Sequence, residues 1–145
     1  MKDLASMINA KRALSPVSVA DTTAQVCQII DRQGFDSLTY LIATGSIADA
    51  DATFTVLLEE SNDSGMSGAT AVADADMISQ SSSAPETAAA FQFDDDNEVR
   101  KLGYVGNMRY TRLTITPVNN ASAALLSVIA VLGHPDLAKV SQSAS

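Results

Sequence analysis

The sequence predicts an all-β protein, an antiparallel β-sandwich of jelly-roll type with an extended N-terminal arm. Two observations predict this fold: short runs rich in Val, Ile, Thr and Tyr recur along the chain, and turn-forming residues bound each run. The 145 residues are enough for one domain with a hydrophobic core. We therefore expect an arm at residues 1–20, a sandwich domain at 21–137 and a polar C-terminal tail at 138–145.

The N-terminal segment is expected to be an arm that becomes ordered only on a partner surface. Apolar residues recur there at helical spacing, but the run is too short to be stable alone, and Pro16 prevents its continuation as a helix. Such a segment gains backbone hydrogen bonds and apolar contacts when it docks. The residues expected to bind the partner are Leu4, Met7, Ile8, Lys11, Arg12, Leu14 and Val17.

Three strands are predicted in the first half of the chain. Residues 24–31 form the first, and residues 37–44 form the second, which has apolar side chains on both faces and is expected to be covered on both sides. Residues 53–59 alternate cleanly, which is typical of a half-buried strand in an antiparallel sheet. Its buried face is expected to hold Phe54, Val56 and Leu58.

Residues 61–90 lose this periodicity and are predicted to form a long surface excursion, of a length that is usually functional or mobile. Phe91 and Phe93 are expected to return the chain to the core, and Asp94 to Asn97 to form a turn.

Two strands at 98–105 and 108–116 are expected to form a hairpin through Gly106-Asn107, because both residue types tolerate positive φ. The last run, 123–132, is almost wholly apolar. A helix is an alternative there, but the β-branched residues and the turn signals at both ends favour a central strand buried on both faces.

The charge balance excludes several classes of function. Nine Lys and Arg against seventeen Asp and Glu give a net charge of −8, which repels nucleic acid and anionic membranes. Thirteen of the carboxylates fall between residues 33 and 99, a stretch without Lys or Arg. This block is either a set of solvated loops or an acidic face opposite a basic edge that meets a partner. The cations of that edge are Arg100, Lys101, Arg109 and Arg112, unless they neutralise carboxylates of their own chain.

No motif for catalysis, a cofactor or a metal is present. His134, the only histidine, lies between Gly and Pro and is interpreted as a turn residue, and Cys27 as a small buried hydrophobe. Phosphate-binding glycine loops are absent, and the clustered aspartates lack the full pattern of a Ca²⁺ loop, although weak Ca²⁺ binding is an alternative. The apolar runs are too short to span a membrane or to form a signal peptide. We expect a protein without enzymatic activity.

Five segments carry a resemblance to a known family. They are FDSLTY at 35–40, DATFTV at 51–56, KLGYVG at 101–106 followed by RYTRL at 109–113, and LGHP at 132–135. Between residues 25 and 135 the sequence resembles the head decoration proteins of tailed phages, also called cement or auxiliary capsid proteins. The resemblance implies a sandwich or jelly roll on the outer surface of the capsid, which forms dimers or trimers and clamps neighbouring major capsid subunits.

The expected function is therefore that of a structural virion protein, made in the bacterial cytoplasm, that stabilises a phage capsid from outside. Its partners would be the major capsid protein and further copies of itself. The negative charge fits this position, because packaged DNA repels an acidic protein from the interior. Two alternatives remain. One is another virion component, such as a neck, tail-tube or head-completion protein, and the other is a carbohydrate- or receptor-binding sandwich that uses residues 61–90.

Overall fold

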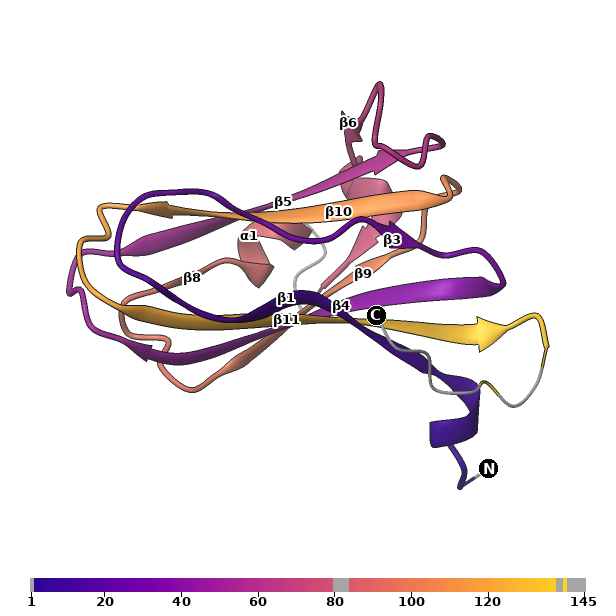
Figure 1. Cartoon of the computed structure of the whole chain (residues 1–145), viewed down its shortest axis with the longest axis horizontal. Coiled ribbons are helices and arrows are strands. Elements are labelled where there is room, and N and C mark those ends of the chain that lie inside the picture. Colours follow the sequence, from indigo (N-terminus) through magenta and orange to yellow (C-terminus); the bar gives the residue numbers. More distant parts are fainter. Residues whose placement is uncertain (1, 80–83, 138–139, 141–145) are drawn as a thin grey trace.

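Two antiparallel sheets pack face to face in the computed structural model, which describes residues 2–79, 84–137 and 140 (Figure 1). Sheet A contains, in spatial order, β1 (Asn9–Val19), β11 (Ala124–Pro135), β4 (Phe35–Ile47), β9 (Val99–Tyr104) and β7 (Met77–Ile78). Sheet B contains β2 (Gln25–Val26), β10 (Tyr110–Val118), β5 (Thr53–Ser61) and β6 (Thr70–Ala71), with β3 (Ile30–Asp31) also paired to β10 and β8 (Phe91–Gln92) to β5.

The strand order is that of a jelly roll. The first and last long strands, β1 and β11, are neighbours in sheet A, and the strands between them are divided between the two sheets. With β2 and β3 taken as one interrupted strand, the orders β1-β11-β4-β9 and β2-β10-β5-β6 are the two interleaved four-stranded sheets of that fold. The predicted all-β sandwich is thus confirmed.

The core lies between the two sheets and follows from the alternation of the strands. Leu38, Tyr40 and Ile42 of β4 face inward, as do the alternate apolar residues of β11, β5 and β10. The hydroxyl group of the buried Tyr40 lies 2.7 Å from Oγ1 of Thr111, so the polar groups of the two sheets satisfy each other in the core. Phe54, Val56 and Leu58 are buried as expected.

The N-terminal segment differs from the predicted arm. Residues 9–19 form β1, which pairs with β11 along most of its length, so the sandwich begins at Asn9 rather than at residue 21. Pro16 does not end the strand but lies in one of two irregularities of its register. A strand can form here because β11 supplies backbone partners for most of its residues, which local spacing does not reveal. The polar tail lies outside the described residues, apart from Val140.

The segment before β1 does project from the sandwich. It contains a short 3₁₀ turn, η1 (Ala5–Met7), and leaves the molecule on the side of sheet A, away from β5 and β10 (Figure 1). Leu4 is 68% exposed. Residues 2–5 of this segment are exposed, whereas residues 6–8 are half-buried, η1 contacts β11, and the carbonyl of Ser6 accepts from the amide of Val140.

The strand predicted at residues 24–31 is broken in two. Between β2 and β3 the amide of Cys27 donates to the carbonyl of Leu113 in sheet B, whereas the next amide, of Gln28, donates to the carbonyl of Ala13 in β1. One short segment thus joins the edges of both sheets, which is why it cannot continue as a regular strand.

The predicted hairpin at Gly106-Asn107 is wrong. The flanking strands β9 and β10 belong to different sheets, so the chain crosses the sandwich there. Gly106 does not have positive φ. A glycine stands there for space, because a Cβ atom would lie 2.5 Å from the hydroxyl oxygen of Tyr104.

Tyr104, Glu60, Arg32 and the Met108 amide form a group of polar contacts at this end of the sandwich, which we call the latch. Its hydroxyl group donates to Oε2 of Glu60 in sheet B at 2.5 Å and accepts from the amide of Met108 at 2.9 Å. The guanidinium of Arg32 lies 5.3 Å from the centre of the Tyr104 ring and donates to the carbonyls of Gly106 and Met108. The latch therefore fixes the crossover that joins the two sheets.

Residues 61–90 are more than a surface loop. The described part contains β6, β7, the 3₁₀ turn η2 (Asp74–Asp76) and a short helix, α1 (Pro85–Ala89), which contacts both β5 and β9. Oε1 of Glu86 accepts from the amide of Leu58, so the helix completes hydrogen bonding at the open side of the sandwich. Phe91 is buried and stacks on Phe54, but Phe93, expected in the core, is 40% exposed because β8 ends at Gln92.

The last strand is central, as predicted, but it is not buried on both faces. Leu125 and Ile129 of β11 are each 46% exposed on the side of sheet A that faces away from the core. The outward residues of β4 are also not fully covered, since they are half-buried.

Within the described residues, no helix is long and apolar enough to cross a membrane.

We predict that Tyr104→Phe lowers the free energy of unfolding by about 1–3 kcal/mol, because it leaves the Met108 amide and the Glu60 carboxylate without their partner. Urea unfolding measures the change. Tyr110→Phe is the matched control, since the Tyr110 ring packs beside Arg109 and the substitution keeps the ring. Equal losses in both variants would contradict the role given to the latch.

Candidate functional site

The outer face of sheet A carries a row of four side chains across four strands. Arg12 of β1 is opposite Ile129 of β11, Ile129 is opposite Leu41 of β4, and Leu41 is opposite Lys101 of β9. Residues directly opposite each other in antiparallel strands point to the same face. Two aliphatic side chains thus lie at the centre of the face with one cation on each side. We call these four residues the central row.

Further apolar and small residues extend the face on both sides of the central row. Val131, Thr39 and Gly103 form the next row in one direction, where Ile78 of β7 is opposite Gly103 and 59% exposed. Ala43 and Val99 lie in the other direction, and Val99 is 60% exposed. Contiguous exposed aliphatic residues on a sheet face are typical of a surface that meets another molecule.

Two hollows open on this face, one beyond each side of the central row. The first, of about 410 Å³, is lined by Pro16 to Ser18, Ala43 to Gly45 and Leu125 to Ser127. The second, of about 350 Å³, is lined by Ser37 to Thr39, Ile78, Ser79, Lys101 and Gly103 to Val105. Glycine makes room in both: a Cβ atom on Gly45 would lie 2.9 Å from Cβ of Leu125, and Gly103 has no side chain to fill the second hollow.

The charge of sheet A is opposite to that of the chain. Its described strands contain four cations, Lys11, Arg12, Arg100 and Lys101, but a single carboxylate, that of Asp36. The whole chain has a net charge of −8. Arg12 and Lys101 point to the outer face, whereas Lys11 is opposite the buried Ala130 and Arg100 is opposite the buried Ile42. The outer face of sheet A therefore combines two cations with apolar residues on an acidic molecule.

The outer face of sheet B is different, because its charges are already paired. Nε and one terminal nitrogen of Arg109 each donate to the Asp31 carboxylate at 2.8 Å, and Arg112 donates to Glu59 at 3.2 Å. Threonines occupy much of the remaining surface of β5 and β10. Val26, Leu57 and Val118 are exposed on this face too, so it differs from the outer face of sheet A mainly in that its charges are already paired.

The four cations of the predicted basic edge do not form one surface in the structure. Arg100 pairs with Asp95 and Glu98 at 2.9 and 3.0 Å, and Arg109 and Arg112 pair with Asp31 and Glu59, so these three cations neutralise carboxylates of their own chain. Lys101 alone of the four lies in the central row, and it makes no ion pair within the described part of the chain.

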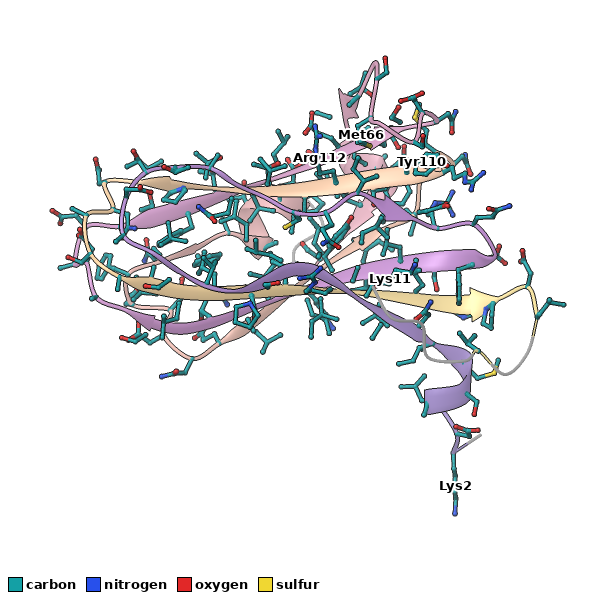
Figure 2. The ribbon with its side chains drawn as sticks, viewed as in Figure 1. Lys2, Lys11, Met66, Tyr110 and Arg112 are labelled. Carbon is teal, nitrogen blue, oxygen red and sulfur yellow. The ribbon has the colours of Figure 1, made fainter. Side chains whose placement is uncertain are left out.

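The N-terminal residues predicted to bind a partner also lie in different parts of the structure. Leu14 and Val17 are half-buried and pack against the core of their own sandwich, and Val17 also lines the first hollow. Lys11 is opposite the buried Ala130, on the inner side of the sheet edge, whereas Arg12 is on the outer face, where it donates to Ser15. Leu4, Met7 and Ile8 lie in the projecting segment, whose tip is marked by Lys2 on the opposite side of the molecule from Arg112 and Tyr110 (Figure 2).

The residues with potential chemistry lie apart from one another. Cys27 is buried, and burial raises the pKa of its thiol to about 12. His134 has positive φ in β11, and its Nδ1 lies 2.8 Å from Oγ of Ser37, a contact that the sequence did not predict. This contact lies at the exposed end of sheet A and uses the only histidine of the chain. Among the described residues, no three His, Cys, Asp or Glu side chains are placed to hold a metal ion.

Sequence reasoning missed the apolar residues of the site, namely Leu41, Ile78, Val99 and Ile129. Their strands were assigned correctly for the most part, but a face exposed in one chain cannot be distinguished by periodicity from a face covered by a second layer. The signal that could have indicated the site was the scarcity of carboxylates in the β4, β9 and β11 segments, in a chain that is acidic elsewhere.

The comparison with one solved structure, that of PBSX exported protein XepA, supports the fold. No family model and no curated protein matches the sequence. Among solved structures, the crystal structure of PBSX exported protein XepA is similar over 94% of this chain, with a TM-score of 0.54 and 13% identity, and a family two carbohydrate esterase from Cellvibrio japonicus over 93%, with a TM-score of 0.36 and 10% identity. The chain spans 40% and 36% of the lengths of these two proteins.

We predict that Asp31→Asn destabilises the protein at pH 7 and that this difference shrinks as the pH falls. The hydrogen bonds from Arg109 hold the pKa of Asp31 below its ordinary value of 3.8, so the ion pair contributes stability above that value and loses it as the carboxylate becomes protonated. Urea unfolding at pH 7 and near pH 3 measures both differences. Asp94→Asn, a change at an exposed turn carboxylate, is the control, and a difference for Asp31→Asn that does not depend on pH would contradict the ion pair.

We also predict that Cys27 does not react with a thiol reagent such as Ellman's reagent while the protein is folded. The side chain is 4% exposed, and the raised pKa keeps the nucleophilic thiolate scarce. Full reaction is expected in urea above the unfolding transition. Rapid stoichiometric reaction of the native protein would contradict the assignment of Cys27 to the core.

Proposed function

We propose that this protein is a structural component of a bacteriophage particle that binds the outside of the capsid and stabilises it by bridging major capsid subunits. The observation that carries the proposal is the outer face of sheet A, where exposed aliphatic residues and cations are grouped on an otherwise acidic chain. Such a face is suited to adhesion between proteins, because apolar area supplies affinity and charge supplies specificity.

The resemblance of five sequence segments to phage head decoration proteins supports the same proposal. The fold is compatible with it, since a jelly roll is a rigid support for a flat binding surface. The solved structure of PBSX exported protein XepA contributes the fold alone, at 13% identity. The proposed function includes no catalytic step. Cys27 is buried, and His134 lies at the exposed end of sheet A beside Ser37.

The position on the outside of the capsid is supported by charge. A net charge of −8 opposes entry into a shell filled with packaged DNA, and the acidic loops favour contact with water over contact with nucleic acid. A protein bound through sheet A would direct its self-paired sheet B away from the shell.

Binding to purified heads tests this function. Heads assembled from the major capsid protein of the genome that encodes this chain are mixed with the purified protein and sedimented. We predict saturable co-sedimentation, a higher temperature of head disruption, and weaker binding when NaCl rises from about 0.05 M to about 0.5 M, because salt screens the exposed charges.

Two results would contradict the proposal. Failure to bind heads at either salt concentration would exclude the capsid role. Assembly of the purified protein into closed hexameric or dodecameric rings would instead favour a neck or tail-tube component.

A further inference from the structure

We infer that the outer face of sheet A docks a protein surface that presents an aliphatic patch flanked by two carboxylates. The inference rests on the proposed function and specifies the chemistry that the capsid partner must offer. It also specifies which side of the molecule faces the capsid.

The central row fixes the geometry of the partner. Ile129 and Leu41 are adjacent across β11 and β4, with Arg12 and Lys101 at the two ends of the row. Three strand spacings separate β1 from β9, so the two cations are anchored roughly 14 Å apart. A complementary surface therefore has two Asp or Glu side chains about that far apart, with aliphatic side chains between them.

The two hollows define where apolar side chains of the partner would enter. They lie on opposite sides of the central row, and each is lined largely by aliphatic side chains and small residues. Leu125 borders one hollow and Ile78 borders the other. A partner with side chains that fill both hollows would bury these residues together with Ile129, which is how a few anchors come to dominate an interface.

A second copy of this chain does not have the required chemistry at this face. In a symmetric pair with sheet A against sheet A, the two central rows lie directly over each other when the in-plane twofold axis runs along the strands or across them. The first places Arg12 opposite Lys101, and the second places each cation opposite its own copy, so both bring like charges together. The described strands of sheet A contain only Asp36 to compensate, near the start of β4. Charge complementarity therefore favours a different, acidic partner.

The projecting N-terminal segment extends the same surface. Residues 2–8 leave the molecule on the side of sheet A, and Leu4 is exposed at 68% (Figure 1). A partner seated on the central row would also meet this segment. The part of the N-terminus that is available for docking is therefore much shorter than the 20 residues expected from the sequence.

The test compares substitutions on the two faces of the sandwich. Ile129→Asp places a carboxylate in the apolar centre, and Lys101→Glu reverses one flanking charge. We expect binding to purified heads to weaken by about tenfold or more for Ile129→Asp and by several-fold for Lys101→Glu. Lys101→Gln is expected to reduce the dependence of binding on salt. Leu57→Asp on the outer face of sheet B, where Leu57 is 40% exposed, is the matched control and should bind as the wild type does.

The outcomes separate this inference from the proposed function. If the wild type does not bind heads, both are wrong. If the wild type binds and both sheet A variants bind equally well while retaining the wild-type melting temperature, the docking face is wrong but the capsid role stands. A wild-type homodimer that Ile129→Asp converts to a monomer would also overturn the inference, because the occupant of the face would then be a second copy. Should Ile129→Asp fail to fold, Lys101→Glu decides alone.

Discussion

The pairing of β11 with strands on both sides is the constraint on which the rest of the structure depends. A strand alternates its side chains between two faces, so a nearly continuous apolar run must expose half of its residues unless both faces are covered. In β11 the inward half, Leu126, Val128, Ala130 and Leu132, forms the core. The outward half, which includes Leu125 and Ile129, forms an exposed surface. The inward face of β11 thus contributes to the core, and its outward face contributes to the candidate site.

The distribution of charge supports this division. Carboxylates are placed in turns and loops, where they accept backbone hydrogen bonds, as Asp49 does from Asp51 and Ala121, or in ion pairs, as Asp31 does with Arg109. The strands of sheet A largely lack them. Charged groups on exposed strands commonly prevent association between sheets. Among the described residues of this face, Arg12 and Lys101 are the two that serve that purpose. The same two cations that discourage self-association would attract an acidic partner.

Much of the fold could be predicted from the sequence, but the relation between segments could not. The strands at 37–44, 53–59 and 123–132 have clear local signals, and their inward faces are correct where alternation is strict, as at Phe54. Gly106 shows the limit of local signals. Its turn chemistry indicates a hairpin, yet it is needed because Tyr104, two residues away, packs over it in a crossover between sheets. The N-terminal strand was missed for a similar reason, because its partner lies more than 100 residues away. At the candidate site the sequence supplied Arg12 and Lys101, but their alignment with Ile129 and Leu41 depends on the register of four strands.

The central claim is that this molecule acts by adhesion through one face of its sandwich. A cryo-electron microscopy reconstruction of heads saturated with the purified protein tests the claim most directly. We expect the strands of sheet A to lie against the shell, with Ile129 at the centre of the contact, and β5 and β10 to face the solvent. A reconstruction in which sheet B or the segment between β5 and β9 contacts the shell, while sheet A faces the solvent, would contradict it.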